Sequence, residues 1–228
     1  MSWISERKEA RFEITGGNIL DARTYNFALG GMVLYGLVVN LVMYHFFGGI
    51  ASTINPIAFL VGYFVCAILG IVLSSKSTNP LISFIGYNLV VVPVGLVVGI
   101  VVESYIENGD AELVFQAIVL TAVITTIMIN LSIIFPQFFS KLGGLLLGAL
   151  IGLIIAELLS IFFFPWAQTT LAWIGAGIFT LYIGYDYWKA QQYPKTLDNA
   201  IDSAIDIYLD IINLFLRILE ILGSKSRD

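Results

Sequence analysis

Long apolar stretches separated by short polar connections dominate this sequence and leave it few ways to fold. A helix that crosses a bilayer needs about 20 consecutive, mainly apolar residues. Stretches of that length lie at residues 26–47, 54–73, 81–102, 113–135, 142–164, 169–188 and 201–222. Only 12% of the residues are charged, whereas an ordinary soluble domain has about 25%. The sequence therefore predicts an all-α membrane protein, a bundle of seven transmembrane helices.

Basic residues are confined to alternate connections, which predicts the orientation of the chain. Lys and Arg in short loops stay on the cytoplasmic side of a membrane. Before the last span they lie in the N-terminal arm and in the second, fourth and sixth connections: Arg7, Lys8, Arg11, Arg23, Lys76, Lys141, Lys189 and Lys195. We therefore expect a cytoplasmic N-terminus. A complete seventh span places the C-terminus outside, while Lys225 and Arg227 favour a last helix that does not fully cross.

The connections are too short for a separate soluble domain. We expect a cytoplasmic arm at residues 1–25, a transmembrane domain at residues 26–222 and a C-terminal tail at residues 223–228. The sequence contains no stripe of basic residues, so we do not expect it to bind nucleic acid. With Cys66 as the one cysteine and His45 as the one histidine, we expect no disulfide, no transition-metal centre and no catalytic triad. The sequence thus predicts neither an enzyme nor a cofactor.

Glycines recur at four-residue spacing in two of the apolar stretches. Gly144, Gly148 and Gly152 share one face of the fifth, and Gly95 and Gly99 repeat the pattern in the third. Small residues at this spacing let helix backbones approach closely in a membrane. A phosphate-binding loop is the competing interpretation, but no Lys-Ser/Thr follows these glycines. We therefore expect them to pack against a neighbouring helix.

Acids lie where a membrane tolerates them least. Asp198, Asp202, Asp206 and Asp210 recur along the last predicted helix, and Asp186 lies in the one before it. A step of four residues turns a helix by about 400°, so the four carboxylates form one slowly winding stripe. An ionised side chain near the bilayer centre costs roughly 2.5–3.5 kcal/mol, so such residues usually face a partner or a water-filled path. These acids are the candidate functional residues.

Asp186 and Asp210 can meet because the last two helices are antiparallel. The turn at Pro194 is a little early for this, but the pair can still meet if the sixth helix extends to Tyr193 and the first turn of the next helix, with Asp198 and Asp202, stays in water. Two adjacent carboxyls cannot both ionise cheaply, so they would share a proton that acts as a latch between the helices. Loss of that proton, or its exchange for a cation held by the carboxylate oxygens, would change the helix packing.

The alternative interpretation of these acids is structural. Asp186 would lie at an interfacial helix end, bonded to Lys189. Asp198, Asp202 and Asp206 would form a solvated face at the N-terminal end of the last helix, which the helix dipole favours for acids. Both interpretations stay open at this point.

Three further acids are candidates for an ion path, namely Asp202, Asp206 and Glu157. Glu157 lies near the outer end of the fifth stretch, where it would line the path or serve as a structural acid. Arg217 follows Asp210 by seven residues on the same side of the helix. We expect its side chain to snorkel outward or to pair with Asn213.

Three segments carry a resemblance to a known family. They are Tyr208-Leu-Asp210-Ile-Ile-Asn213-Leu-Phe-Leu-Arg217-Ile-Leu, Leu181-Tyr-Ile-Gly-Tyr-Asp186 and Lys141-Leu-Gly-Gly-Leu-Leu-Leu-Gly-Ala-Leu-Ile-Gly-Leu-Ile. With them the chain resembles the Bax inhibitor-1 family of small seven-helix membrane proteins. Its short arm resembles that of bacterial members, which implies the bacterial cytoplasmic membrane.

The resemblance implies a central last helix, wrapped by the other six, and a calcium leak that pH controls through two aspartates. Asp186 and Asp210 match these aspartates, and calcium would bind them transiently as the transported ion. Some members pair one aspartate with a basic residue. Lys76 and Arg217 are the candidates for such a basic latch here.

Other functions compete with a leak. A non-conducting regulator that binds another membrane protein, such as a protease or a component of a stress or death pathway, would use the acids structurally and the glycines for partner helices. An intramembrane aspartyl protease is disfavoured because Asp210 follows Tyr-Leu rather than a Gly-x-Gly turn. A proton-coupled solute carrier is disfavoured because the chain shows no internal repeat.

Overall fold

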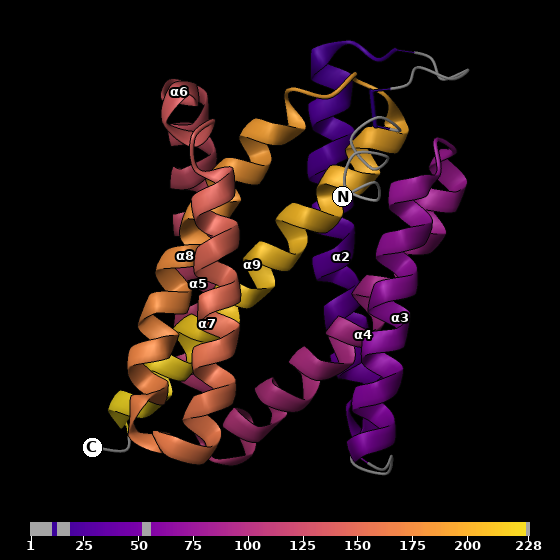
Figure 1. Ribbon diagram of the computed structural model, residues 1–228. Helices are drawn as coiled ribbons and strands as arrows, with labels where there is room; N and C mark the ends of the chain where they lie inside the picture. The colour runs from indigo at the N-terminus through magenta and orange to yellow at the C-terminus, as the bar shows by residue number, and fades with distance from the viewer. Residues whose placement is uncertain (1–10, 13–18, 52–55, 227–228) are drawn as a thin grey trace. The chain divides into compact units, whose positions relative to one another are not determined.

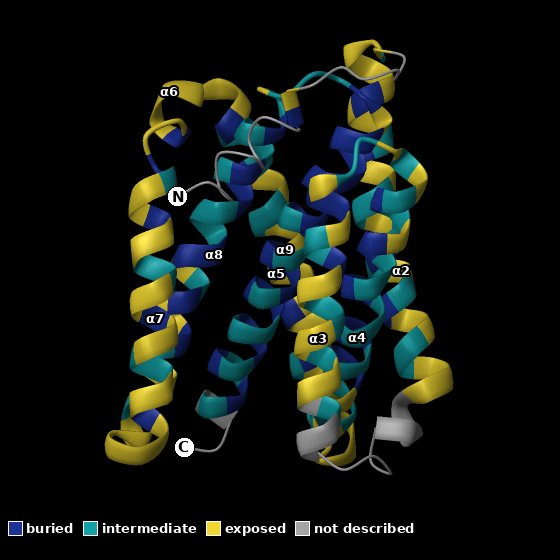
Figure 2. Cartoon of the chain, turned by 45° about the vertical axis from the view of Figure 1, so that its right-hand side comes forward, coloured by how far each residue is buried: buried dark blue, intermediate teal, exposed yellow. Residues whose placement is uncertain are grey.

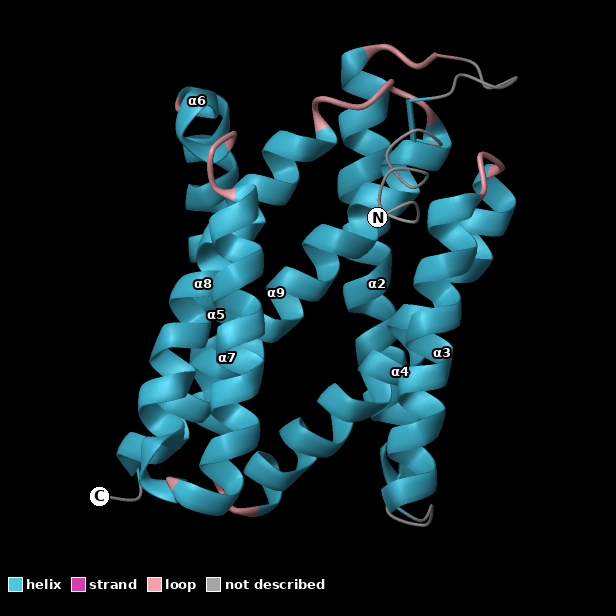
Figure 3. Cartoon of the chain, in the orientation of Figure 1, coloured by secondary structure: helices cyan, strands magenta, loops and turns pink. Residues whose placement is uncertain are grey.

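The computed structural model describes residues 11–12, 19–51 and 56–226, and within them the chain is almost entirely helical (Figures 1 and 3). The helices are α2 (Ala22–Ala51), α3 (Pro56–Lys76), α4 (Pro80–Glu107), α5 (Ala111–Ile134), α6 (Pro136–Phe139), α7 (Gly143–Phe163), the short 3-10 helix η1 (Pro165–Ala167), α8 (Gln168–Ala190) and α9 (Leu197–Ser226). No strand occurs in the described ranges. The prediction of an all-α protein is confirmed.

The predicted membrane spans are confirmed in part. Four helical segments are long and apolar enough to cross a bilayer, at Ala22–Phe47, Pro80–Glu107, Ala111–Ile134 and Gly143–Phe163. Helix α3 contains a shorter apolar segment at Val61–Lys76. Helices α8 and α9 cover the sixth and seventh predicted stretches. The chain is thus a multi-pass membrane protein, and crossing by α3, α8 and α9 remains a prediction. Much of the predicted arm, including Arg7 and Lys8, and the end of the predicted tail, including Arg227, lie outside the described residues.

Local chemistry explains where helices begin. The carboxylate of Asp21 caps α2, accepting hydrogen bonds from the backbone N–H of Arg23 at 2.9 Å and of Thr24 at 3.0 Å. The hydrogen bonds with Thr24 lower the pKa of Asp21. Helix α4 begins at Pro80, whose missing N–H costs nothing in the first turn. Gly109 turns the chain between α4 and α5 with a φ of 86°, which favours glycine.

The chain forms two compact units. Unit 1 contains Met1–Ser104 and Ala190–Tyr208, and unit 2 contains Tyr105–Lys189 and Leu209–Asp228. Helices α4 and α9 each contribute to both units.

Within unit 1, close glycine contacts join α2, α3 and α4, which lie side by side (Figures 1 and 2). A Cβ atom on Gly70 of α3 would lie 2.5 Å from the carbonyl oxygen of Gly86 of α4. Tyr208 of α9 donates a hydrogen bond of 2.7 Å to the side-chain oxygen of Asn40 on α2. Its ring meets that of Tyr87 edge-on, with centroids 6.0 Å apart. The first part of α9 is therefore anchored among the three helices.

Within unit 2, glycines on α7 and α8 receive aromatic side chains. The ring of Tyr185 on α8 fills the space beside Gly143 of α7, and the ring of Phe139 on α6 lies against Gly184 of α8. Tyr105 donates a hydrogen bond of 3.2 Å to the carbonyl oxygen of Leu219 on α9. The first two contacts join α6, α7 and α8. The third joins the last part of α9 to the end of α4.

The predicted glycine packing is confirmed for α4 and wrong for three glycines of α7. Gly95 and Gly99 of α4 lie directly against Asn40 and Tyr44 of α2. By contrast, a Cβ atom on any of the three α7 glycines would meet nothing within 4 Å among the described atoms: Gly144, Gly148 and Gly152. Their shared face is exposed. The spacing places them on one side of α7, and that side faces away from the rest of unit 2.

This contrast yields a stability prediction. Gly86→Ala inserts a methyl group 2.6 Å from the backbone oxygen of Gly70, and overpacking of this kind costs about 1–3 kcal/mol. Gly148→Ala meets open space and instead gains helix propensity. We expect Gly86→Ala to lower the thermal unfolding midpoint in detergent and Gly148→Ala to leave it unchanged or raise it. Equal midpoints for the two variants would contradict the α3–α4 packing.

Candidate functional site

The acids of α9 are buried by protein. Asp198 and Asp202 are each 6% exposed and Asp210 is 7% exposed, and α9 is buried along most of its length (Figure 2). A solvated acidic face at the start of α9 is therefore wrong for Asp198 and Asp202. The condition that they stay in water is also not met. Helices α3 and α4 cover this turn, so the carboxylates need protein partners.

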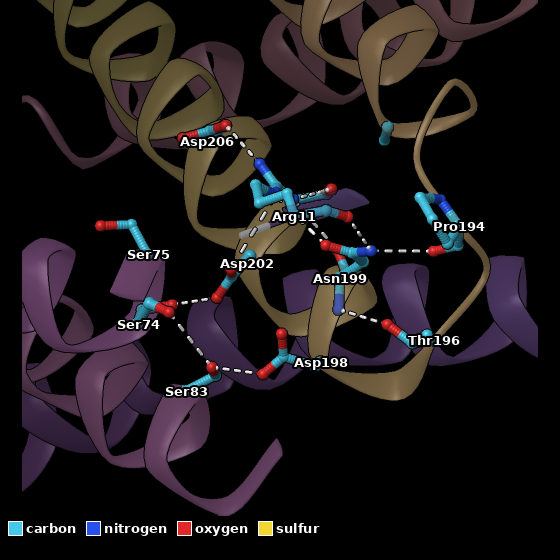
Figure 4. A network of polar contacts seen from close by, with 12 residues as sticks. Arg11, Ser74, Ser75, Ser83, Pro194, Thr196, Asp198, Asn199, Asp202 and Asp206 are labelled. Atoms are coloured by element: carbon cyan, nitrogen blue, oxygen red, sulfur yellow. Dashed lines mark hydrogen bonds and ion pairs between the residues drawn. The ribbon is translucent and has the colours of Figure 1, made fainter. Parts of the chain in front are cut away.

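Serine hydroxyls supply partners for two of these carboxylates (Figure 4). Ser83 of α4 donates a hydrogen bond of 2.6 Å to Asp198, and Ser74 of α3 donates one to Asp202. Hydrogen bonds to an ionised acceptor are roughly twice as strong as neutral ones. The start of α9 is thus fixed to both helices.

Arg11 supplies the positive charge of this network. Its guanidinium forms ion pairs of 3.8 Å with Asp202 and with Asp206. It donates a hydrogen bond of 2.7 Å to the hydroxyl of Ser203 and lies 3.9 Å from the centroid of the Tyr193 ring. The residue is only 5% exposed. An arginine of the predicted cytoplasmic arm is therefore part of the interior of unit 1.

Asn199 connects this network to the backbone of the arm and of the turn before α9. Its amide donates hydrogen bonds to the carbonyl oxygens of Arg11 at 3.0 Å and of Pro194 at 2.9 Å. Its backbone N–H donates to the hydroxyl of Thr196 at 3.1 Å, as in a helix N-cap. One side chain therefore connects the arm, the turn before α9 and the first turn of α9 (Figure 4).

The network keeps Arg11 charged. Burial lowers the pKa of Arg11, but the carboxylates of Asp202 and Asp206 raise it, and the pKa stands above its ordinary value. For Asp198, burial raises the pKa, against the opposing effects of Ser83 and Arg11.

The basic partner of these acids is thus Arg11. Lys76, a candidate latch from the sequence, is exposed at the end of α3. The hydrogen-bond partners of Arg11 lie 188 or more positions away, and no local spacing indicates such a contact. The only sequence signal was its place among the arm's basic residues.

Asp186 and Asp210 both belong to unit 2 and are both 7% exposed. Lys189 forms an ion pair of 3.0 Å with Asp186, as the structural interpretation predicted. Tyr182 lies one turn before Asp186 on α8, and both carboxylates act electrostatically on its hydroxyl. Helix α8 ends at Ala190, so the predicted extension to Tyr193 is wrong. Both aspartates therefore lie in one unit and within electrostatic range of Tyr182.

Glu157 and Arg217 also meet in unit 2. The guanidinium of Arg217 forms ion pairs with Glu157 of α7 and, at 3.2 Å, with Glu220 of α9. The amide of Asn213 instead donates to the carbonyl oxygen of Leu209 at 2.7 Å, so the predicted pairing of Arg217 with Asn213 is wrong. Among the described residues, no group of three or more His, Cys, Asp or Glu side chains is arranged to hold a metal ion.

Apolar helices of membrane-spanning length, combined with buried ion pairs, define a multi-pass α-helical membrane protein. The chain belongs to the Bax inhibitor-1 family, because the family model described as "Inhibitor of apoptosis-promoting Bax1" matches residues 18–227. This is a family of membrane regulators and channels rather than a known enzyme family.

Two curated relatives share part of the sequence. They are uncharacterized proteins from two strains of Helicobacter pylori, each 38% identical to this chain over 74 residues. The match covers 32% of this chain and 31% of each relative. The chain therefore aligns with about a third of the length of these relatives.

Arg11 gives a direct prediction. Arg11→Gln removes the guanidinium and leaves buried carboxylates without their counter-charge, which costs on the order of 3–5 kcal/mol. We expect a large fall in the thermal unfolding midpoint. Arg23→Gln is the control, because Arg23 is exposed in the same arm, and its midpoint should stay at the wild-type value. Equal midpoints for the two variants would show that the buried network does not hold the arm.

Asp198 gives a prediction with a defined pH dependence. Because burial raises its pKa above the ordinary 3.8, the folded protein binds this proton more tightly than the unfolded chain does. The resulting stabilisation is complete below pH 3.8 and is lost as the pH rises through the folded-state pKa. We expect the wild-type midpoint minus the Asp198→Asn midpoint to fall over that window. A difference that grows with pH would mean that Ser83 and Arg11 outweigh burial.

Proposed function

We propose that this protein is a pH-sensitive calcium leak channel gated by Asp186 and Asp210. The observation that supports the proposal best is that two buried carboxylates from different helices, α8 and α9, lie in one unit, both within electrostatic range of the Tyr182 hydroxyl. Buried ionisable groups in a membrane protein usually mark ion paths or proton relays. Membership in a family of membrane regulators and channels agrees with this function.

In the closed state, Asp186 and Asp210 share a proton, because two desolvated carboxylates cannot both ionise cheaply. Lys189 compensates one negative charge from a distance of 3.0 Å. Calcium takes carboxylate oxygens as ligands, so it can replace the proton transiently as the transported ion. The exchange alters the attraction between α8 and α9 and shifts their packing. No cofactor takes part.

The number of spans and the position of the last helix that we propose are those that the resemblance to the Bax inhibitor-1 family implies. We propose seven membrane spans, with α3, α8 and α9 added to the four helices that are long and apolar enough to cross, and a central last helix. Burial along most of α9 supports its central position. The basic connections favour a cytoplasmic N-terminus, and the bacterial cytoplasmic membrane is the proposed location. Exposed apolar side chains on α7, including Leu145, Leu147 and Ile151, face the lipid in this arrangement.

A non-conducting regulator that binds another membrane protein is the second candidate. The exposed face formed by Gly144, Gly148 and Gly152 favours it, because such a face lets a partner helix approach closely. In this alternative the buried acids only stabilise the fold.

Calcium flux into liposomes that contain the purified protein separates the two functions. We expect a wild-type flux that changes with pH, because a proton shared by two adjacent carboxyls titrates as a property of the pair. Asp186→Asn and Asp210→Asn should each abolish this pH dependence, since each removes one member of the pair. Glu112→Gln, a substitution at an exposed acid of α5, should behave like wild type.

Flux equal to that of empty liposomes in every sample would reject the leak and leave the regulator. A pH-dependent flux that survives both aspartate substitutions would keep the leak and reject this gate.

A further inference from the structure

A cavity of about 180 Å³ lies in unit 2 beside the connection between α7 and α8. Its lining includes Glu157 and Ser160 of α7, Gln168 and Leu171 of α8, and Arg217 and Glu220 of α9. Roughly 10–15 Å³ of such a volume is enough for one water molecule, so the space suits several waters or a hydrated ion. The guanidinium of Arg217 and the carboxylates of Glu157 and Glu220 therefore border one space that is large enough for several water molecules.

Three helices hold the guanidinium of Arg217 in place. Glu157 of α7 and Glu220 of α9 both pair with it. On α8, Gly175 leaves room for it, because a Cβ atom there would lie 3.0 Å from Nε of Arg217. The positive charge is thus fixed at the cavity and does not extend away from the protein.

Arg217 is also aligned with the proposed gate. It follows Asp210 by seven residues, which is two helical turns and roughly 10 Å along α9. Seven residues rotate a helix by about 700°, so both side chains leave α9 on nearly the same side. A cation that moved from the cavity along this side of α9 toward Asp210 would pass the guanidinium first.

We propose that Arg217 is the residue that controls cation access to this cavity. Its fixed positive charge compensates Glu157 and Glu220 and repels cations at close range, as arginines do at constrictions of other pores. Without it, two carboxylates face the cavity alone and attract cations. The role of this access in calcium flux rests on the proposed leak, whereas the exclusion of cations from the cavity does not.

Thiol modification measures this access without any flux. Gln168 is exposed at the cavity, so Gln168→Cys in a Cys66→Ala background places one thiol there. The ratio of its reaction rates with a cationic trimethylammonium thiosulfonate and with an anionic sulfonate analogue reports which charge enters. Arg217→Gln should raise this ratio at least about threefold, since a nearby unit charge acts even through water. Arg217→Lys, which keeps the charge, should stay within about twofold of wild type.

Glu220→Gln is a second variant, which tests the proposal even where Arg217→Gln does not fold. It removes a negative charge at the same cavity, so the ratio should fall. Size-exclusion profiles and helical circular dichroism establish which variants are folded. An unchanged ratio in folded Arg217→Gln, or in folded Glu220→Gln where Arg217→Gln does not fold, overturns the proposal.

Calcium flux in the same liposomes then distinguishes the two proposals. If wild type leaks calcium, Arg217→Gln should leak several-fold faster than Arg217→Lys, and equal rates would overturn the role of Arg217 in the leak. If wild type does not leak at any pH, the leak is rejected, and the thiol ratios still decide whether Arg217 excludes cations from the cavity.

Discussion

The burial of carboxylates along α9 is the constraint on which the rest of the structure depends. A helix that carries Asp198, Asp202 and Asp210 inside a membrane protein is stable only when protein groups replace the lost water. In unit 1 those groups are the hydroxyls of Ser74 and Ser83 and the guanidinium of Arg11. The packing of the first part of α9 therefore follows from the needs of its acids as well as from its apolar residues.

The buried acids of the two units have different partners, and we infer from this that the acids have different roles. The carboxylates of Asp198 and Asp202 accept hydrogen bonds from serines and share one arginine, so this network fixes the start of α9. In unit 2, Asp186 has a lysine one turn away on its own helix, and both Asp186 and Asp210, on α9, act electrostatically on the Tyr182 hydroxyl. We regard the first network as structural and the second group as the proposed gate.

Much of the fold could be predicted because apolar length and turn chemistry are local properties. The predicted stretches coincide with long helices, and Pro80 and Gly109 mark observed boundaries. The acids were recognised because charge is conspicuous in apolar sequence. Arg11 was missed because its contacts cross most of the chain. The outward direction of Gly148 was missed because spacing defines a helix face without stating what covers it.

The central claim is that Asp186 and Asp210 hold one proton jointly, and infrared difference spectroscopy of the reconstituted protein tests it most directly. The account predicts a carbonyl band from a protonated carboxyl, at a pH above the ordinary carboxyl pKa of about 4, that disappears in Asp186→Asn and equally in Asp210→Asn, because the pair titrates as a unit. A band that survives either substitution, or two carboxyls that titrate independently near their ordinary values of about 4, would contradict it.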